Sequence, residues 1–124
     1  MENRELRIDI QERSFQFAVR IVKLCQFLSA KPGVSRTLSN QLIRSGTSIG
    51  ANIEEAQGGQ SRADFLSKMS IALKEARETH YWLKLLSAAD IVKPELVSEI
   101  QSEANEITAI LTSIVKSTKE NKNG

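Results

Sequence analysis

Residues 44–56 read RSGTSIGANIEEA and lie inside a longer amphipathic pattern that is typical of a helix. Six of these thirteen residues are Gly, Ala or Ser, and Gly46 and Gly50 stand four positions apart. Each glycine costs a helix interior up to about 1 kcal/mol relative to alanine. Keeping both predicts a close approach to a neighbouring element, because glycine adds no side-chain bulk. Polar residues recur at helical spacing along the same segment: Ser48, Asn52 and Glu55.

Outward from this stretch, four segments repeat apolar residues every three to four positions and are separated by short Gly-, Pro- or Asp-containing connections. The helices are expected at Gln11–Ala30, Ser35–Gln57, Arg62–Ala89 and Pro94–Lys116. Helices joined by short loops pack antiparallel to their neighbours. The predicted fold class is therefore all-α, an antiparallel up-down-up-down four-helix bundle over residues 11–116. Residues 1–10 are expected to form a polar N-terminal segment, and residues 117–124 a flexible basic tail.

Helix starts carry recognisable signals. Ser35 is the expected N-cap of the second helix, and Ser61 with Asp64 three residues later approximates a capping box at the third. Pro94 stands where the first turn of the fourth helix is expected, and Leu96 is predicted to begin its inward face.

Two neighbouring apolar stripes run along the first helix, which is wider than a two-stranded contact needs. One stripe consists of Phe15, Ala18, Val22 and Cys25, and the other of Phe17, Ile21, Leu24 and Leu28. We therefore expect this helix to contact more than one partner.

Length and composition describe one ordinary domain. The chain has 124 residues, 40% hydrophobic and 26% charged, which is enough for a core without disulfides or metals. The single cysteine, Cys25, excludes an internal disulfide and lies among apolar residues, so it is expected to be buried. No signal-peptide core follows the N-terminus, and no apolar run approaches the roughly 18 residues of a membrane span. A cytoplasmic protein is expected.

Charge is distributed unevenly, although the formal net charge is only +2. The segment from Arg13 to Ile53 contains six basic residues and no acidic one. Such a basic half is a candidate footprint for nucleic acid or an acidic partner, and ordinary solvated helix faces are the alternative. The candidate nucleic-acid contacts are Arg13, Arg20, Lys23, Arg36 and Arg44.

Chemistry-bearing residues are few. Glu75 and Glu78 share one helix face, and Glu55 could approach from the second helix. Paired Glu-x-x-His motifs would be needed for a di-iron bundle site, and the lone His80 does not supply them. The alternative is a structural network in which Glu55 or Glu75 meets Arg44, Arg77 or a serine. We predict no metal, no cofactor and no catalytic residue, since nucleophile and phosphate-loop motifs are also absent from the sequence.

Tyr81 and the only tryptophan, Trp82, lie beside the main seam of the third helix. Aromatic residues supply large contact area at interfaces while keeping one polar end hydrated. Two placements stay open: packing within the monomer, or contact with a neighbouring subunit.

The middle of the chain resembles bacterial four-helix bundle proteins of the 23S rRNA intervening-sequence type. The resemblance rests on SIGANIEE at residues 48–55, SRADF at residues 61–65 and IALKEARE at residues 71–78. Its signature positions are Gly46, Ser48, Gly50, Asn52, Glu55, Glu75 and Glu78. The chain departs from the family pattern in having Phe15 and Phe17 where a tryptophan is expected, and Ala56 where glycine is common.

The resemblance implies a four-helix bundle that forms homo-oligomers, with pentameric rings expected. It also implies a relation to the accessory variability determinant proteins of diversity-generating retroelements, which partner a reverse transcriptase and bind nucleic acid through a basic surface. We therefore expect a non-enzymatic homo-oligomeric scaffold, with RNA or DNA as candidate ligands of the first two helices. The alternative is a protein-interaction accessory subunit that does not touch nucleic acid.

Overall fold

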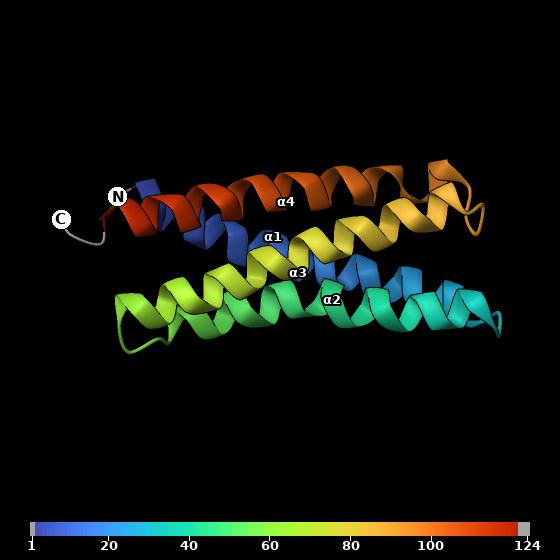
Figure 1. The fold of residues 1–124 in the computed structure, drawn as a ribbon, viewed down its shortest axis with the longest axis horizontal. Coiled ribbons are helices and arrows are strands. Elements are labelled where there is room, and N and C mark those ends of the chain that lie inside the picture. Colours follow the sequence, from blue (N-terminus) through green and yellow to red (C-terminus); the bar gives the residue numbers. More distant parts are fainter. Residues whose placement is uncertain (1, 122–124) are drawn as a thin grey trace.

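The computed structural model describes the backbone of residues 2–121 and the side chains of residues 9–121. It contains four helices: α1 (Glu2–Ser29), α2 (Val34–Gln57), α3 (Arg62–Ala88) and α4 (Pro94–Glu120). Successive helices run in opposite directions, and each packs against two neighbours, α1 on α2 and α4, and α3 on α2 and α4 (Figure 1). The predicted all-α up-down-up-down bundle is confirmed.

Helix ends differ from the predictions in three places. The first helix begins at Glu2, so the predicted polar segment before it is helical over its described residues, and Ile10 is fully buried. The fourth helix continues to Glu120, and residues 122–124 of the predicted tail lie outside the described residues. Ser35 is not the N-cap of α2. Gly33 occupies that position, and the Ser35 hydroxyl donates to the Leu28 carbonyl at 2.8 Å.

The other two start signals are confirmed. The Ser61 hydroxyl accepts a hydrogen bond from the Asp64 amide at 3.1 Å, and this caps α3. Pro94 lies in the first turn of α4, where its missing N–H leaves no hydrogen bond unmade.

Only one of the two stripes on α1 enters the core along its whole length. Phe17, Ile21, Leu24 and Leu28 are buried. In the other stripe, Cys25 is buried as predicted, whereas Phe15 is 61% and Val22 37% exposed. Leu96 was also predicted to face inward, and this is wrong: it is 47% exposed and the adjacent Val97 is buried.

The two glycines of residues 44–56 differ in how closely α1 approaches them. A Cβ atom on Gly46 would lie 2.8 Å from Cγ2 of Ile21, a side chain that is itself fully buried. A Cβ atom on Gly50 would lie 3.4 Å from the Ser14 carbonyl oxygen, which is ordinary van der Waals contact. The predicted close approach is therefore made at Gly46, where α2 packs on α1.

This difference predicts opposite effects for two matched substitutions. Gly46→Ala should lower the free energy of unfolding by about 1–2 kcal/mol, because overpacking against a branched buried side chain outweighs the gain in helix propensity. Gly50→Ala should raise it by up to about 1 kcal/mol. Urea unfolding followed by circular dichroism measures both. Equal shifts of the same sign would contradict the assignment of the tight contact to Gly46.

Candidate functional site

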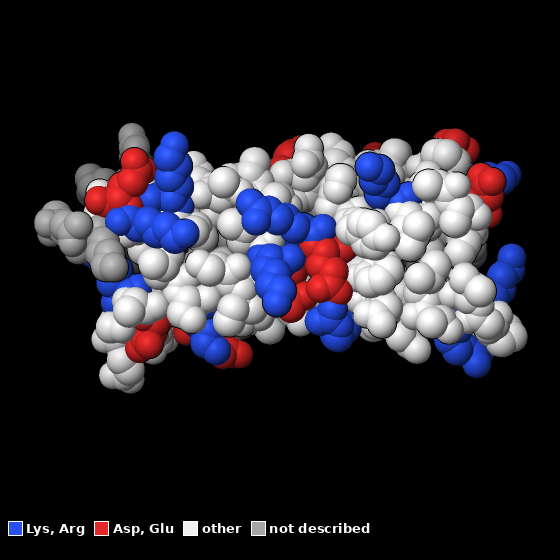
Figure 2. All heavy atoms as spheres, in the orientation of Figure 1, with Lys and Arg blue, Asp and Glu red and all other residues white. Residues whose placement is uncertain are grey.

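A charged network lies across the middle of α2 and α3 and gathers most of the polar residues singled out from the sequence. Arg44 on α2 forms an ion pair with Glu78, and its Nη1 lies 3.5 Å from Oε1 of Glu75. The indole N–H of Trp82 donates to Oε2 of Glu78 at 3.0 Å. Basic and acidic side chains are interleaved over this part of the surface (Figure 2). We call these four residues the Arg44 network.

The Arg44 network confirms the structural alternative in which Glu75 meets Arg44. The Glu75 side chain is only 14% exposed, and its Oε1 atom has no hydrogen-bond partner among the described residues, so the Arg44 ion pair is its compensation. The hydrogen bond from Trp82, together with the nearby Arg44 guanidinium, holds the pKa of the Glu78 carboxyl below its usual range. The network therefore favours the ionised form of Glu78 at the contact between α2 and α3.

A neutral polar pair lies just inside the Arg44 network. The hydroxyls of Ser45 on α2 and Thr79 on α3 form a hydrogen bond of 2.9 Å, and both residues are fully buried. Each hydroxyl also bonds to a carbonyl of its own helix, Ser45 to Leu42 at 3.3 Å and Thr79 to Glu75 at 2.8 Å. The pair therefore adds a polar contact between helices whose members stay hydrogen-bonded in the core. Ser48 and Asn52 do not take part: they donate to the α2 carbonyls of Arg44 and Ser48 at 2.7 and 2.8 Å.

The acidic residues do not converge on a metal position. Glu55 pairs with Lys68 at 2.8 Å on an exposed surface, instead of joining Glu75 and Glu78. Among the described residues, no group of three or more His, Cys, Asp or Glu side chains is placed to hold a metal ion. None of the helices over the same residues is long and apolar enough to cross a membrane.

Trp82 is half-buried and packs against the core, and Tyr81 is turned outward. The indole N–H of Trp82 bonds to Glu78. The Tyr81 ring meets the Trp82 ring edge-on, with 5.2 Å between the ring centroids. Tyr81 is 56% exposed, so its ring forms an aromatic surface beside Trp82.

The five cations predicted to contact nucleic acid do not form one cluster. Arg13 makes a two-pronged hydrogen bond to Glu103 on α4, at 3.1 and 2.9 Å, and a third contact to Glu106 at 2.7 Å. Arg44 belongs to the Arg44 network, where α2 packs against α3. The charge of both arginines is thus offset by carboxylates of α3 or α4, which come later in the chain.

The remaining three cations are less constrained. Arg20 lies 3.8 Å from Glu99, whose side chain is 92% exposed, and Arg36 donates through Nε to the Ser29 carbonyl at 3.0 Å. Lys23 is exposed on α1. Sequence reasoning missed the role of Glu103 and Glu106, although their three-residue spacing places them on one face of the fourth helix.

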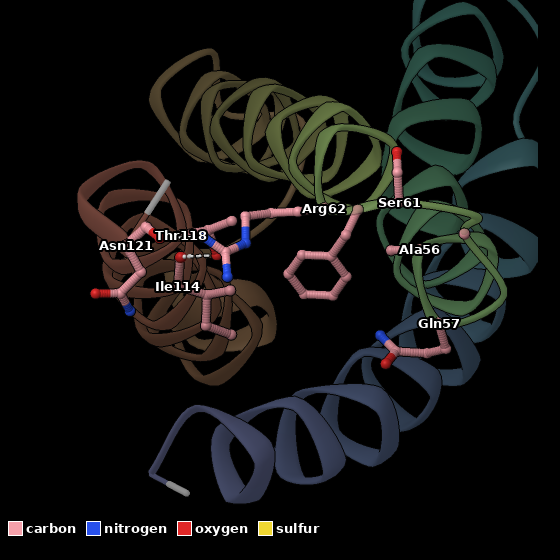
Figure 3. A pocket seen from close by; sticks show the side chains of 9 residues that line it. Ala56, Gln57, Ser61, Arg62, Ile114, Thr118 and Asn121 are labelled. Carbon is pink, nitrogen blue, oxygen red and sulfur yellow. Dashed lines mark hydrogen bonds between the residues drawn. The ribbon is translucent and has the colours of Figure 1, made fainter. Parts of the chain in front are cut away.

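A hollow of about 350 Å³ lies at the end of the bundle where α2 turns into α3 (Figure 3). Its polar side chains bond to backbone carbonyls: Gln57 to Ile53 at 2.9 Å, Thr118 to Ile114 at 2.8 Å, and Arg62 to Asn121. The Arg62 cation lies beside the last carbonyls of α4, where a positive charge is favoured. Only the Arg62 bond joins α3 to the end of α4, since the Gln57 and Thr118 bonds stay within α2 and α4, and none of the three points into the hollow.

The fold and these contacts define a class: an antiparallel four-helix bundle whose charged residues mainly connect its own helices. The chain belongs to the 23S rRNA-intervening sequence protein family, whose sequence profile matches residues 7–113. It is similar to a crystal structure of a protein of unknown function from the S23 ribosomal protein family of Bacteroides thetaiotaomicron. The two share 49% sequence identity with a TM-score of 0.80, over 86% of this chain and 98% of the other. No curated protein matches the chain.

The lowered pKa of Glu78 predicts an acid-sensitive contact between α2 and α3. A carboxyl whose pKa is lower in the folded than in the unfolded state stabilises the fold above the unfolded value, and this contribution is lost as pH falls through the folded value. Stability should therefore decline below about pH 4.3, the usual glutamate value. Glu78→Gln should remove this part of the decline, as measured by urea unfolding between pH 7 and 3.

Trp82 provides a local readout of the same titration, because it is the only tryptophan and donates to Glu78. Its fluorescence should change over the acid range in the native protein and stay flat in Glu78→Gln. Glu99→Gln is the matched control, since that side chain is 92% exposed. A control variant that loses the same pH dependence would contradict the role given to Glu78.

Proposed function

We propose that this protein is a non-enzymatic homo-oligomeric helical scaffold that assembles into a ring, with five subunits expected from the family resemblance. The observation that carries the proposal is the uncovered apolar stripe of α1, where Phe15 is 61% and Val22 37% exposed. Large apolar side chains aligned along one helix face lose contact with water when a second subunit covers them, which favours association.

A shallow hollow beside this stripe supports the same conclusion. It has a volume of about 190 Å³ and lies between α1 and α2, with Phe15, Ala18, Gly50 and Ala51 among its lining residues. The small residues of α2 leave this space next to the exposed phenylalanine. Gly50 and Ala51 of α2 therefore extend the exposed apolar surface of α1. The hollow beside them offers room for a side chain of a neighbouring subunit.

A ring is favoured over a two-fold dimer because a second exposed aromatic lies on a different helix. Tyr81, 56% exposed, is on α3, which occupies the position diagonal to α1 in the bundle. Two different patches on opposite helices suit a head-to-tail contact, in which one patch of each subunit meets the other patch of the next. Head-to-tail contacts close into rings when the rotation between subunits allows it.

The oligomer prediction is tested by charging the stripe. The wild-type protein should sediment as one oligomer with a mass near five times the 13.8 kDa of a single chain. The double variant Phe15→Glu, Val22→Glu should be a folded monomer, because both side chains are exposed in the subunit. Native mass spectrometry supplies the subunit number. A wild-type protein that stays monomeric at high concentration would overturn the proposal.

A matched control separates this stripe from other apolar surface. Phe27 is also on α1 and is 63% exposed, but it lies at the α4 side of the helix. Phe27→Glu should leave the oligomer intact. Tyr81→Ala should weaken the assembly without unfolding the subunit.

Contact with RNA or DNA is the second part of the proposal, now limited to cations not neutralised by close carboxylates. Lys23, Arg36 and, more weakly, Arg20 retain charge that could face phosphates, and a ring would repeat them around its circumference. Arg13 and Arg44 are assigned to contacts between helices. The alternative is an accessory subunit that binds another protein, for instance a nucleic-acid enzyme such as a reverse transcriptase.

Binding to a structured RNA and to duplex DNA, titrated with salt, tests this part. The triple variant Arg20→Ala, Lys23→Ala, Arg36→Ala should reduce the slope of log affinity against log salt by about 2–3, since each phosphate contact contributes about 0.7–0.9. The control is Lys84→Ala, Lys116→Ala, Lys119→Ala, which removes three exposed cations elsewhere. No measurable binding by the wild type would favour the accessory-subunit alternative.

A further inference from the structure

The contact between α1 and α4 is incomplete at one end of the bundle. The two helices lie together near the chain termini and diverge toward the opposite end (Figure 1). Two hollows, of about 680 and 370 Å³, occupy the diverging end, and Phe27 and Leu96 line both of them. We call this continuous surface the Phe27–Leu96 groove.

The groove is apolar along its floor. Leu24, Leu28, Val92 and Ile100 line it and belong to the core, with only 2–9% of each side chain exposed. Phe27 and Leu96 stand on opposite walls, 63% and 47% exposed. Arg20 and Phe27 stand seven positions apart on α1, and Ile100 on α4 stands seven positions after Lys93, the N-cap of that helix. Each wall therefore spans about two helical turns, about 11 Å.

The charge around the groove is mostly positive. Five charged residues line the two hollows, and four of them are basic: Arg20, Lys23, Lys31 and Lys93, against the single acidic residue Glu95. Basic residues thus stand at the α1 wall, at the turn after α1 and at the start of α4. An apolar floor with a basic rim is complementary to a helix that is apolar on one face and acidic on its flanks.

We propose that the Phe27–Leu96 groove binds an acidic amphipathic helix of a partner protein. The partner helix would place apolar side chains, spaced three to four residues apart, between Phe27 and Leu96, and its carboxylates beside Lys23, Lys31 and Lys93. Nucleic acid fits this surface less well, because the exposed rings and aliphatic chains at its centre offer no phosphate contact. A second copy of the chain is the other protein that could cover this surface, and the oligomeric state of Phe27→Ser tests for it.

The binding is tested with a designed peptide of about 18 residues, long enough to be helical in water, with leucines at helical spacing and glutamates elsewhere. A second peptide keeps the leucines and replaces every glutamate with lysine. The glutamate peptide should bind at least about tenfold more tightly than the lysine peptide, and its affinity should fall between about 50 and 300 mM salt. Equal binding of both peptides would overturn the proposal.

Substitutions locate the site. Phe27→Ser should weaken the glutamate peptide by about tenfold or more, as expected for a central anchor, and Lys23→Glu with Lys93→Glu should remove its advantage over the lysine peptide. Both changes are on exposed positions, and circular dichroism checks that the bundle is retained. Phe15→Ser is the matched control, because it alters the other exposed phenylalanine of α1 and should leave peptide affinity unchanged.

Two further measurements separate other occupants of the groove. If Phe27→Ser dissociates the oligomer in the absence of peptide, the groove is a contact between copies and the proposal fails. If RNA competes with the glutamate peptide and its own binding is lost with Phe27→Ser and with Lys93→Glu alone, the groove is a nucleic-acid surface and the proposal fails, because neither residue is among the proposed RNA contacts. A peptide effect confined to the groove variants supports it, whatever the oligomeric state proves to be.

Discussion

The contact of Gly46 with Ile21 is the constraint on which the rest of the bundle depends. Because residue 46 has no side chain, the α2 backbone lies directly against a buried isoleucine of α1. That contact fixes the rotation of α2, and the rotation directs Ser45 toward Thr79 on α3. On α3, Glu75 lies one turn before Thr79 and Glu78 lies one residue before it. Both carboxylates are thereby placed opposite Arg44. A single small residue thus determines the polar contacts between its own helix, α2, and α3.

The opposite side of the bundle is built differently. Long side chains, Arg13 with Glu103 and Glu106, connect α1 and α4 near the middle of the two helices. Such contacts hold helices together while permitting a wider spacing, and away from the chain termini the two helices diverge (Figure 1). The tight side of the molecule therefore specifies the fold, and the open side leaves apolar surface available for recognition.

Local pattern was enough to predict the four helices, their order and the Ser61 cap, because apolar period and capping depend on residues within one or two turns. It could not decide between the two stripes of α1. Phe15 and Phe17 are equivalent in sequence, and only the rotation imposed by α2 makes one exposed and the other buried. An error of one residue also explains why Leu96 was predicted to face inward, whereas Val97 is the residue that is buried.

Electrostatic partners were predicted where helix order made them neighbours and missed where they lay far along the chain. The pairing of Arg44 with Glu75 was anticipated as one alternative, since consecutive helices pack together. The basic run containing Arg13 was interpreted as a surface because no acidic residue occurs within it. Its partners, Glu103 and Glu106, are about ninety residues away and meet it only when α4 closes against α1.

The single cysteine is a chemical probe of how often α1 and α2 separate. Cys25 is 3% exposed, its thiol lies 3.5 Å from the Ser39 carbonyl on α2, and burial raises its pKa. An alkylating reagent can reach this sulfur only during moments when α1 and α2 separate. Since no other cysteine competes for the label, the rate of modification reports how often α1 and α2 separate.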